Sequence, residues 1–473
     1  MSQIEVVPST SRHNNIDKTQ ELCFVTSKRG GEILLNDGYQ YYKKKDNKNG
    51  SSRWNCKYKS KCRGTITIKG NTIMNKVSHS KNCVRDHAGN EIKKEISTWK
   101  VESGQGVLPL QTIYNEGVNR LKDRGLNLLT RIPNFNNVKH GLYNSRRKEF
   151  GIDNIKPKTV TDVKVPVKYN DFLMADYQEG ARRILIFSSK EAREKLKTVK
   201  HFFADGTFKC VVPPFVQMYS IHGDLGSTEK STNIKPLIYA LVTDKKEETY
   251  QIIFQLLLSQ NPSWKPEKFT TDFETAQMNA IQSVFPEVDI KGCFFHFTQA
   301  LSKKAKSLHI LKNRACKRHV ALCAALALLP EQATDEGWFY IMEDWSEENE
   351  NLVKFNDYFT KQWLQKEDMR RIWCFNSERH RTTNSVEAWH SSINKKLCGN
   401  TKPNILQFLS IIKTDASMTS LTIAKLENGH QILNKRKEYI EKDEKIAYIL
   451  EQLDNNYINV GHCLEKLLTY YVF

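Results

Sequence analysis

Hydrophobic and polar residues follow one another with different periods along this chain, and the periods predict its elements. From 21 to 90, apolar and polar residues alternate in short runs broken by Gly and Asn, which is typical of a small sheet with tight turns. From 91 to 165, apolar residues recur in patches at helical spacing, with Arg and Lys scattered between them. Residues 1–20 are polar, and we expect them to be disordered.

A longer core follows, in which strands and helices alternate. Runs rich in Val, Ile, Phe and Tyr predict strands, and apolar residues at intervals of three and four predict helices. The expected order is three strands (201–212, 214–223 and 234–244), a helix (247–260), a strand (268–274), a helix (274–285) and a fifth strand (289–297). This order predicts an α/β sandwich whose first three strands form a meander. Between 165 and 200 the pattern is mixed and predicts only a helix near its end.

The remainder of the chain is mostly helical. Residues 299–380 are rich in aromatic side chains and form a helical insertion in our interpretation, and a second helical block spans 401–473. The predicted fold class is multidomain, with α+β and α/β parts. A small β-rich domain at 21–90 precedes a basic, mostly helical region at 91–165 and a mixed-sheet core at 166–400.

Charge is unevenly distributed and changes the expected partner. The 473 residues carry 72 Lys and Arg against 53 Asp and Glu, a net charge of +19. Residues 1–150 hold 28 of the basic residues but only 13 of the acidic ones, so most of the surplus lies there. An acidic polymer is the natural partner of such a surface, and we expect DNA. The predicted DNA contacts are Lys43, Lys44, Lys45, Arg53, Lys57, Arg63, Arg146 and Arg147.

Cysteine and histidine cluster in the same basic part. Two cysteines, Cys56 and Cys62, are followed after a hairpin-length gap by His79 and Cys83. In small sheets that surround a tetrahedral zinc ion, two ligands close together in the chain are typically followed by a hairpin and then by two more ligands close together. We therefore predict a Zn²⁺ site held by these four residues, with His87 as an alternative ligand, and expect the metal to drive folding of this domain.

Three carboxylates stand out in the core. Asp205 follows two Phe and an Ala in a predicted strand, and Asp272 lies at a junction between a strand and a helix. Glu387 lies on a predicted helix with an apolar face. Carboxylates that converge at one sheet edge repel one another unless divalent cations lie among them, and oxygen ligands select Mg²⁺ or Mn²⁺. We predict such a site, suited to two-metal phosphoryl transfer, with Gly206 leaving room for a phosphate or backbone.

The stretches around these carboxylates resemble a known family. FFADGTF, TDFETAQMNAI, KGCFFHFTQAL and RTTNSVEAWHSSIN occur in this order. They resemble the transposases of Mutator-like elements (MULE type) over about residues 165–400. The resemblance implies a ribonuclease H-like core, interrupted by a helical insertion, with a DDE triad at Asp205, Asp272 and Glu387. The chain has Thr383 where the family commonly has Asn, and it lacks the Cys-rich zinc motif that often follows the core.

Three further residues of these motifs are candidates for the site. The C-x-x-H pair of the family is matched by Cys293 and His296. This pair is either half of a zinc site or, in so apolar a segment, part of the core, and His296 is also a candidate for contact with the scissile phosphate. His390 lies one turn after Glu387 and is a candidate for holding a metal-bound water or a phosphate.

The cysteine cluster carries a second resemblance. Phe24, Leu35, Tyr41, Trp54, Cys56 and Cys62 follow the order of the FLYWCH zinc finger. The chain departs from that pattern where His79 and Cys83 replace the closing His-x-His. The resemblance implies binding of DNA or protein, and the basic surplus favours DNA.

These observations support a DDE-type DNA transposase that binds element ends and catalyses metal-dependent cleavage and strand transfer. The alternatives are a domesticated transposase that regulates through its zinc finger without catalysis, and a ribonuclease H-like nuclease without strand transfer. The expected partners are double-stranded DNA, both terminal inverted repeats and target, and further copies of the chain on DNA. The odd number of cysteines, 11, favours free thiols, and the expected location is the nucleus. The longest apolar run, 320–329, is too short for a membrane span.

Overall fold

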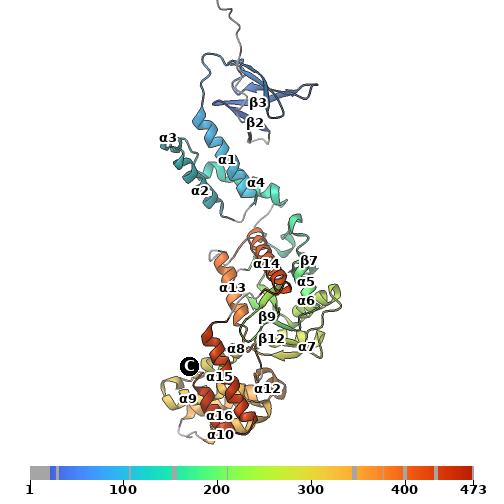
Figure 1. The fold of residues 1–473 in the computed structure, drawn as a ribbon, viewed down its shortest axis with the longest axis vertical. Helices are drawn as coiled ribbons and strands as arrows, with labels where there is room; N and C mark the ends of the chain where they lie inside the picture. Colours follow the sequence, from blue (N-terminus) through green and yellow to red (C-terminus); the bar gives the residue numbers. More distant parts are fainter. Residues whose placement is uncertain are drawn as a thin grey trace, which may run out of the picture. The chain divides into compact units, whose positions relative to one another are not determined.

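The computed structural model divides into two compact units, Met1–Asp153 and Asn154–Phe473 (Figure 1). The residues described are 22–27, 31–105, 108–151, 157–209, 211–343, 349–376, 378–397, 402–430 and 435–470. The tail predicted to be disordered, 1–20, lies outside the described residues. Each unit has its own hydrophobic core, so the two are treated separately below.

The first unit opens with a six-stranded antiparallel meander whose strands pair in chain order. Its strands are β1 (Cys23–Thr26), β2 (Glu32–Asn36), β3 (Tyr39–Asp46), β4 (Ser52–Cys56), β5 (Thr65–Lys69) and β6 (Thr72–Val77). The turn between β2 and β3 places Asp37 at φ 47° and Gly38 at φ 76°, the left-handed conformations that an Asp-Gly hairpin turn adopts. Alternate residues such as Leu34, Tyr41 and Trp54 face inward and form the core of the sheet.

A small helical bundle completes the first unit. Its helices are α1 (His87–Gln105), α2 (Leu110–Asp123), α3 (Leu126–Leu129) and α4 (Phe135–Phe150). They surround the fully buried ring of Trp99. Gly117 of α2 lies against this ring, and a Cβ at that position would overlap it, so the two helices approach closely only because residue 117 is Gly.

The second unit is built on a seven-stranded mixed sheet with the order β13-β12-β9-β10-β11-β8-β7. The strands are β7 (Leu173–Glu179), β8 (Arg182–Phe187), β9 (His201–Thr207), β10 (Gln217–Asp224), β11 (Ile234–Val242), β12 (Lys268–Thr271) and β13 (Asp289–Lys291). Strand β9 pairs antiparallel with β10 and parallel with β12, which in turn pairs parallel with β13. The remaining pairs, from β10 through β11 and β8 to β7, are antiparallel.

Two sequence predictions differ from this sheet. The fifth strand, expected at 289–297, ends at Lys291, and residues from Phe294 onward form helix α8 (Phe294–Ser307). Gly292 interrupts the strand, and the buried rings of Phe294 and Phe297 are one helical turn apart. The mixed segment at 165–200 contains the hairpin of β7 and β8, which the sequence prediction missed.

Helices cover both faces of this sheet. On one face, α6 (Glu247–Gln260) and α7 (Thr275–Val284) bury apolar side chains against Phe202 and Ala204 of β9. Phe203 points to the opposite face and packs on Val386 of α13 (Asn384–Lys396). Helix α14 (Ile405–Glu427) contacts β11 on that side, and the short α5 (Lys190–Lys195) contacts α14.

The helical insertion and the C-terminal helices share one core. The insertion consists of α8, α9 (Arg314–Ala325), α10 (Thr334–Glu343), α11 (Glu350–Phe359) and α12 (Glu367–Trp373). Helices α15 (Lys437–Asp454) and α16 (Val460–Leu468) pack into it through residues such as Ile446 and Leu464. The C-terminal block therefore packs within the unit.

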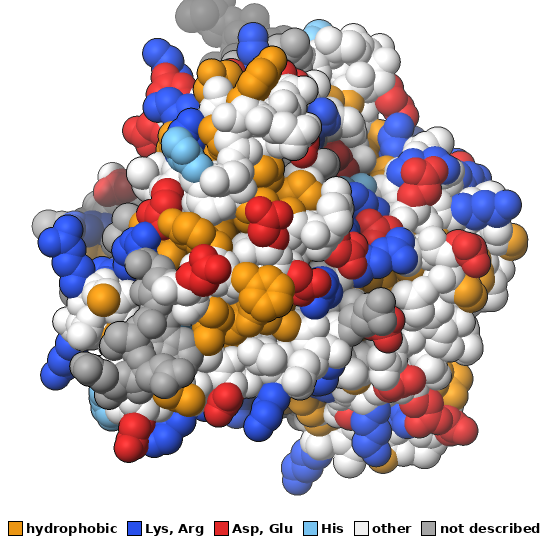
Figure 2. Space-filling model, turned by 90° about the horizontal axis from the view of Figure 1, so that it is seen from below, with side chains coloured by type: hydrophobic (Ala, Val, Ile, Leu, Met, Phe, Trp, Pro, Cys, Tyr) orange, Lys and Arg blue, Asp and Glu red, His pale blue; other side chains and the backbone are white. Residues whose placement is uncertain are grey.

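One face of the molecule shows a concentration of apolar side chains. Figure 2 shows hydrophobic side chains near the middle of this face, with charged side chains of both signs around them. Among the described helices, none combines the length and the hydropathy that crossing a membrane requires.

Candidate functional site

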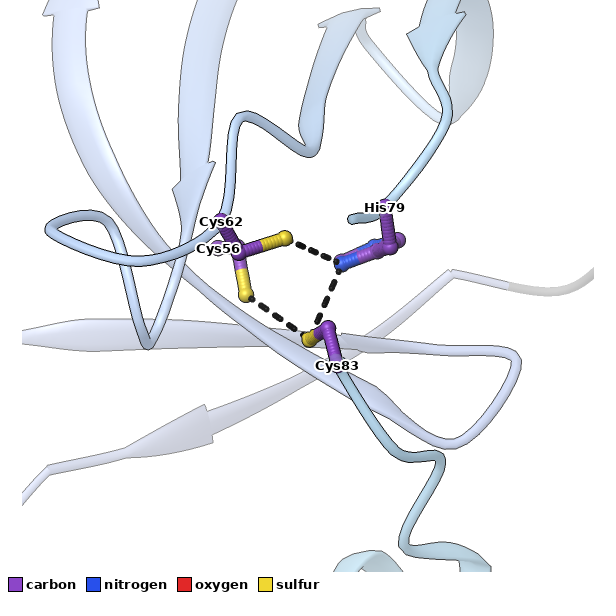
Figure 3. Close-up of side chains that lie close together, drawn as sticks. All are labelled: Cys56, Cys62, His79 and Cys83. Atoms are coloured by element: carbon purple, nitrogen blue, oxygen red, sulfur yellow. Dashed lines mark hydrogen bonds between the residues drawn. The ribbon is translucent and has the colours of Figure 1, made fainter. Parts of the chain in front are cut away.

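Four predicted zinc ligands meet at one end of the first sheet. Cys56 is the last residue of β4, Cys62 lies in the loop before β5, and His79 and Cys83 follow β6 (Figure 3). One ligand atom from each lies within 4.8 Å of every other. Among the described residues, this is the only group of three or more Cys, His, Asp or Glu that meets this criterion.

The separations within this cluster fit a tetrahedral zinc ion. The Sγ atoms of Cys56 and Cys83 are 3.7 Å apart, and His79 Nδ1 lies 3.2 Å from Cys62 Sγ and 3.4 Å from Cys83 Sγ. A tetrahedral Zn²⁺ with Zn–S bonds of about 2.3 Å holds two sulfurs roughly 3.8 Å apart. The four residues therefore fit Zn²⁺ both in chemistry and in spacing.

The imidazole of His79 is held in the orientation that a ligand needs. Its ring stacks on Tyr39, with centroids 3.5 Å apart, and its Nε2 is 2.8 Å from the hydroxyl of Tyr41. This leaves Nδ1 facing the sulfurs, and outer contacts of this kind fix the ring of metal-binding histidines. Gly64 lies under the ring, where a Cβ would come within 2.6 Å of Nδ1.

The thiols of the cluster differ in how readily they ionise. Burial and the neighbouring thiols Cys62 and Cys56 raise the pKa of Cys83 to about 12. Burial opposes ionisation of Cys62 as well, but the amides of Ser80 and Gly64 donate to its sulfur and lower its pKa to about 7. A divalent cation favours ionisation of all three thiols, because it binds the thiolate form of each ligand.

Two predictions for the first unit need correction. His87, the alternative ligand, begins α1 beside Gly38 and does not belong to the four-residue cluster. Arg146, a predicted DNA contact, is buried, and its guanidinium donates to the carbonyl oxygens of Ser103 and Leu108, each at 2.8 Å. The other predicted contacts are exposed: Lys43, Lys44, Lys45, Arg53, Lys57, Arg63 and Arg147.

In the second unit, neighbouring strands bring Asp205 and Asp272 close to each other. Strands β9 and β12 are parallel, and Ala204 is the register partner of Thr271, the last residue of β12. Asp205 is the next residue of β9, and Asp272 directly follows the end of β12, which stops short of the predicted strand at 268–274. Burial, then Asp205, then Glu274 raise the pKa of Asp272 to about 6. The structure thus brings two predicted carboxylates together and makes ionisation of Asp272 less favourable than in an exposed carboxyl group.

Glu387 reaches the same region through a histidine. His296 Nε2 lies 3.4 Å from Glu387 Oε1. The neighbouring sulfur of Cys293, and after it the charges of Glu387 and Asp272, raise the pKa of His296 to about 9. His296 therefore contacts the carboxylate of Glu387 and interacts electrostatically with that of Asp272.

Cys293 is fully buried and holds the start of α13. The amide and the hydroxyl of Thr383 both donate to its sulfur, at 3.3 and 3.2 Å. Within the described part of the chain, no further Cys or His joins this pair in a metal-binding cluster. The arrangement matches the core alternative for Cys293, and Thr383 is the residue that departs from the common family pattern.

His390 is buried behind Asp205. Its Nδ1 lies 3.4 Å from Asp205 Oδ2, and its Nε2 lies 3.1 Å from the hydroxyl of Ser220. The same hydroxyl is 3.1 Å from Nε2 of His222. Because both ring nitrogens face protein atoms, His390 is placed to orient Asp205 rather than to bind a phosphate. Ser220 and His222 carried no motif and were not predicted.

Of the three predicted carboxylates, that of Asp272 lines a polar cavity of about 370 Å³. Asp272 and His296 line it, together with Glu274, Lys245 and Lys303, which the prediction did not include. Lys245 Nζ lies 2.9 Å from Glu274 Oε2. Glu274 was present in the TDFE motif, but nothing in the sequence distinguished it from an ordinary first residue of a helix.

The role expected for Gly206 is also corrected. Its amide donates to Asp205 Oδ1 at 2.7 Å, which fixes the carboxylate. The space beside it is filled by the amide group of Gln217 on β10, with which a Cβ would collide. Gly206 therefore makes room for a neighbouring strand and not for a phosphate.

Comparison with protein families supports both resemblances. Residues 202–300 match the MULE transposase domain, and residues 24–82 match the FLYWCH zinc finger domain. The first match contains Asp205 and Asp272 but ends before Glu387, and the second ends one residue before Cys83. A comparison with curated proteins gives no match. The two domains indicate a transposase-derived protein that binds DNA, with zinc in its finger.

Proposed function

We propose that the chain is a DDE-type DNA transposase, in which Asp205, Asp272 and Glu387 act together in metal-dependent DNA cleavage and strand transfer. The observation that carries this proposal is the register of β9 and β12, which sets Asp205 beside Asp272. Glu387 is joined to the same region by the contact of its carboxylate with His296, whose charge also acts on Asp272.

The topology of the sheet supports a ribonuclease H-like core. The five strands β9 to β13 lie in the spatial order β11, β10, β9, β12, β13. Strand β10 runs antiparallel to the other four, which are parallel to one another. This is the strand arrangement that we expect of the ribonuclease H-like family. The insertion α8–α12 lies between β13 and α13, between the second and third carboxylates.

The donor chemistry fits Mg²⁺ or Mn²⁺. Three carboxylates supply hard oxygen ligands, and the pKa of Asp272 is raised by burial and by the negative charge of Asp205 and Glu274, which a divalent cation would neutralise. When bound, such ions supply Lewis-acid activation of the attacking oxygen and stabilisation of the leaving one.

The protein's own groups orient these carboxylates. His390 and the Gly206 amide hold the two oxygens of Asp205, and the amide of Glu274 donates to Asp272 Oδ1 at 3.2 Å. Lys245 and Lys303 at the adjoining cavity offer positive charge to a DNA phosphate. In this proposal the FLYWCH finger binds the element ends, the chain assembles as a homo-oligomer on DNA, and it works in the nucleus.

The experiment that tests this function is cleavage and joining of DNA with the purified chain. A linear substrate carrying the inverted repeats that flank the coding segment is incubated with a target plasmid, with Mg²⁺ or with EDTA. We expect nicked and joined products only with Mg²⁺, and a loss of at least about 100-fold in Asp272→Asn and Glu387→Gln, because the phosphoryl-transfer site loses a ligand. Glu267→Gln, an exposed carboxylate just before β12, is the matched control.

The products distinguish the competing functions. Nicked but unjoined DNA would identify a nuclease without strand transfer. Specific DNA binding without any Mg²⁺-dependent product would identify a non-catalytic regulator and refute the proposed enzyme.

A further inference from the structure

A second groove, with a volume of about 600 Å³, opens beside the carboxylate site. The first turns of α8 and α13 form part of its wall, and the start of α15 forms another part. Asn384 and Ser385 line it just before Glu387 in the chain, and Phe295 lines it next to His296. The groove therefore adjoins the carboxylates without including them.

The lining of this groove is strongly basic. It contains five Lys and Arg side chains and a single carboxylate, that of Asp443; the cations are Arg379, Arg381, Lys435, Arg436 and Lys442. Asp443 lies 3.6 Å from Arg381 and 3.4 Å from Lys435. One carboxylate cannot balance five cations, so the groove is electrostatically suited to phosphates.

The positive charge continues beyond this groove. A neighbouring hollow of about 660 Å³ shares Arg379 and Lys435 with it. That hollow adds Lys230 and Lys437, against Glu229 alone. The two hollows form a basic path longer than one phosphate group requires, so a polymer fits better than a small anion.

Two exposed aromatic rings project from the lining. Phe295 is 39% exposed and Tyr439 is 58% exposed, although apolar rings are normally buried. Among the described residues, Tyr439 makes no ring contact, and the ring of Phe295 contacts that of His296 beside it. Exposed aromatic rings between basic side chains are the arrangement on which unpaired bases stack.

We propose that this groove binds an unpaired segment of a DNA strand, with bases stacked on Phe295 and Tyr439 and phosphates facing Arg381 and Lys435. Bases in a duplex already stack on one another, so rings that line a groove can stack only on unpaired ones. This inference rests on the proposed function for its substrate, because a strand being cut next to Glu387 is where unpaired nucleotides arise. The binding itself needs no catalysis.

The test uses the full zinc-loaded chain without added Mg²⁺, so that binding is measured without cleavage. A single-stranded oligothymidylate carrying 5-iododeoxyuridine is photocrosslinked, and the linked residues are mapped by mass spectrometry. In parallel, fluorescence anisotropy compares a labelled oligothymidylate with a labelled hairpin duplex for Phe295→Ala and Tyr439→Ala. Tyr448→Ala is the control, since Tyr448 is similarly exposed at 60% on the same helix but lies nine residues away, on the opposite face.

We expect crosslinks at Phe295 or Tyr439 and a loss of about 5- to 100-fold in oligothymidylate affinity for each alanine variant, because a stacked base contributes about 1–3 kcal/mol. Tyr448→Ala and duplex binding should be unchanged. Crosslinks confined to residues 22–151, or wild-type affinity in both variants, would overturn the proposal, and so would equal losses for single strand and duplex. If Asp272→Asn still cleaves DNA while the crosslinks map as expected, the proposed function fails and the groove stands.

Discussion

The carboxylate of Asp272 opposes the stability of the fold when it is ionised. Its pKa is raised from 3.8 to about 6 by burial and by Asp205 and Glu274, so the charged form is less favourable in the folded than in the unfolded chain. This destabilisation is complete above pH 6 and disappears below about pH 4, where both states are protonated.

Asp272→Asn should therefore raise the free energy of unfolding at pH 7 by roughly 3 kcal/mol, with the gain shrinking toward pH 4. Urea unfolding of the two proteins, without divalent metal, measures it. Added Mg²⁺ should stabilise the wild type and not the variant, because the ion binds the folded carboxylates. A variant less stable than the wild type at pH 7 would contradict this account of the site.

Two neighbouring arginines should behave in opposite ways. Arg146 is buried and donates to two carbonyl oxygens, so Arg146→Ala should lower stability by about 1–3 kcal/mol through the carbonyls left unpaired. Arg147 is exposed, and Arg147→Ala should instead leave stability unchanged and reduce the slope of log DNA affinity against log salt by about 1, the effect of one lost phosphate contact. Thermal unfolding and DNA titrations at several salt concentrations measure the two effects, and the reverse assignment would refute the argument.

At the scale of single residues, the sequence predicted Asp205, Asp272 and Glu387 from motif and strand context. It could not separate Arg146 from Arg147, because both belong to one run of basic residues and only helix packing buries the first. His390 was chosen for its spacing from Glu387, but the direction of its ring toward Asp205 and Ser220 depends on how α13 crosses the sheet.

One buried carboxylate, that of Asp415, links helix α13 to α14 and to the sheet. Asp415 of α14 accepts hydrogen bonds from Trp389 and Lys396 of α13, both at 2.7 Å, and from the hydroxyl of Tyr239 on β11 at 3.3 Å. The same helix carries Glu387 and His390, so the position of the site depends on this attachment.

Asp415→Ala should lower the free energy of unfolding by about 2–4 kcal/mol, because the buried hydroxyl of Tyr239 and the half-buried indole of Trp389 lose their acceptor, while the more exposed Lys396 can turn to water. It should also reduce Mg²⁺-dependent cleavage, while Asp415→Asn, which keeps an acceptor, should lose less of both. Asp171→Ala is the control, since the exposed pair of Asp171 with Lys413 should contribute less than about 1 kcal/mol. Equal effects of Asp415→Ala and Asp171→Ala in urea unfolding would contradict this role.

The meander β1–β6 has a small core, and zinc should supply much of its stability. Structural Zn²⁺ contributes on the order of 10 kcal/mol in small domains, so removing one ligand should unfold the sheet. Cys56→Ser is expected to purify without zinc and to lose strand signal in circular dichroism. Cys23→Ser, in the same sheet but outside the cluster, should retain both. Zinc-free wild-type protein with an intact sheet would refute the assignment.

Helices and strands were predicted best where the run of patterned residues was long. The runs of β9, β10 and β11 are rich in β-branched and aromatic residues, and each strand overlaps its predicted range, although β9 ends at Thr207 rather than at 212 and β10 begins at Gln217 rather than at 214. The prediction failed at CFFHF, since a short apolar run is compatible with either a strand or a buried helix, and Gly292 decided the boundary. The hairpin of β7 and β8 was missed because polar residues occupy much of β7, a strand at the edge of the sheet.

For the molecule as a whole, charge and chemistry are divided between the two units. Residues 1–150 carry 15 of the 19 net positive charges, whereas the carboxylate site belongs to the second unit. DNA affinity should therefore depend mainly on the first unit and cleavage on the second. Strands β3 and β4 present exposed cations as register neighbours, with Lys45 opposite Arg53, which suits a duplex backbone.

Replacing Lys44, Lys45 and Arg53 together by Ala should weaken duplex binding and lower the slope of log affinity against log salt by up to about 3, since each lost phosphate contact reduces it by roughly 0.9. Stability should change little, because all three side chains are exposed. At DNA concentrations high enough to saturate the variant, Mg²⁺-dependent cleavage should return to the wild-type rate, because the carboxylates are intact. Lys413→Ala, on the second unit, is the control for the slope. An unchanged slope would place the DNA-binding surface elsewhere, and cleavage that stays low at saturation would show that the first unit contributes to catalysis as well as to binding.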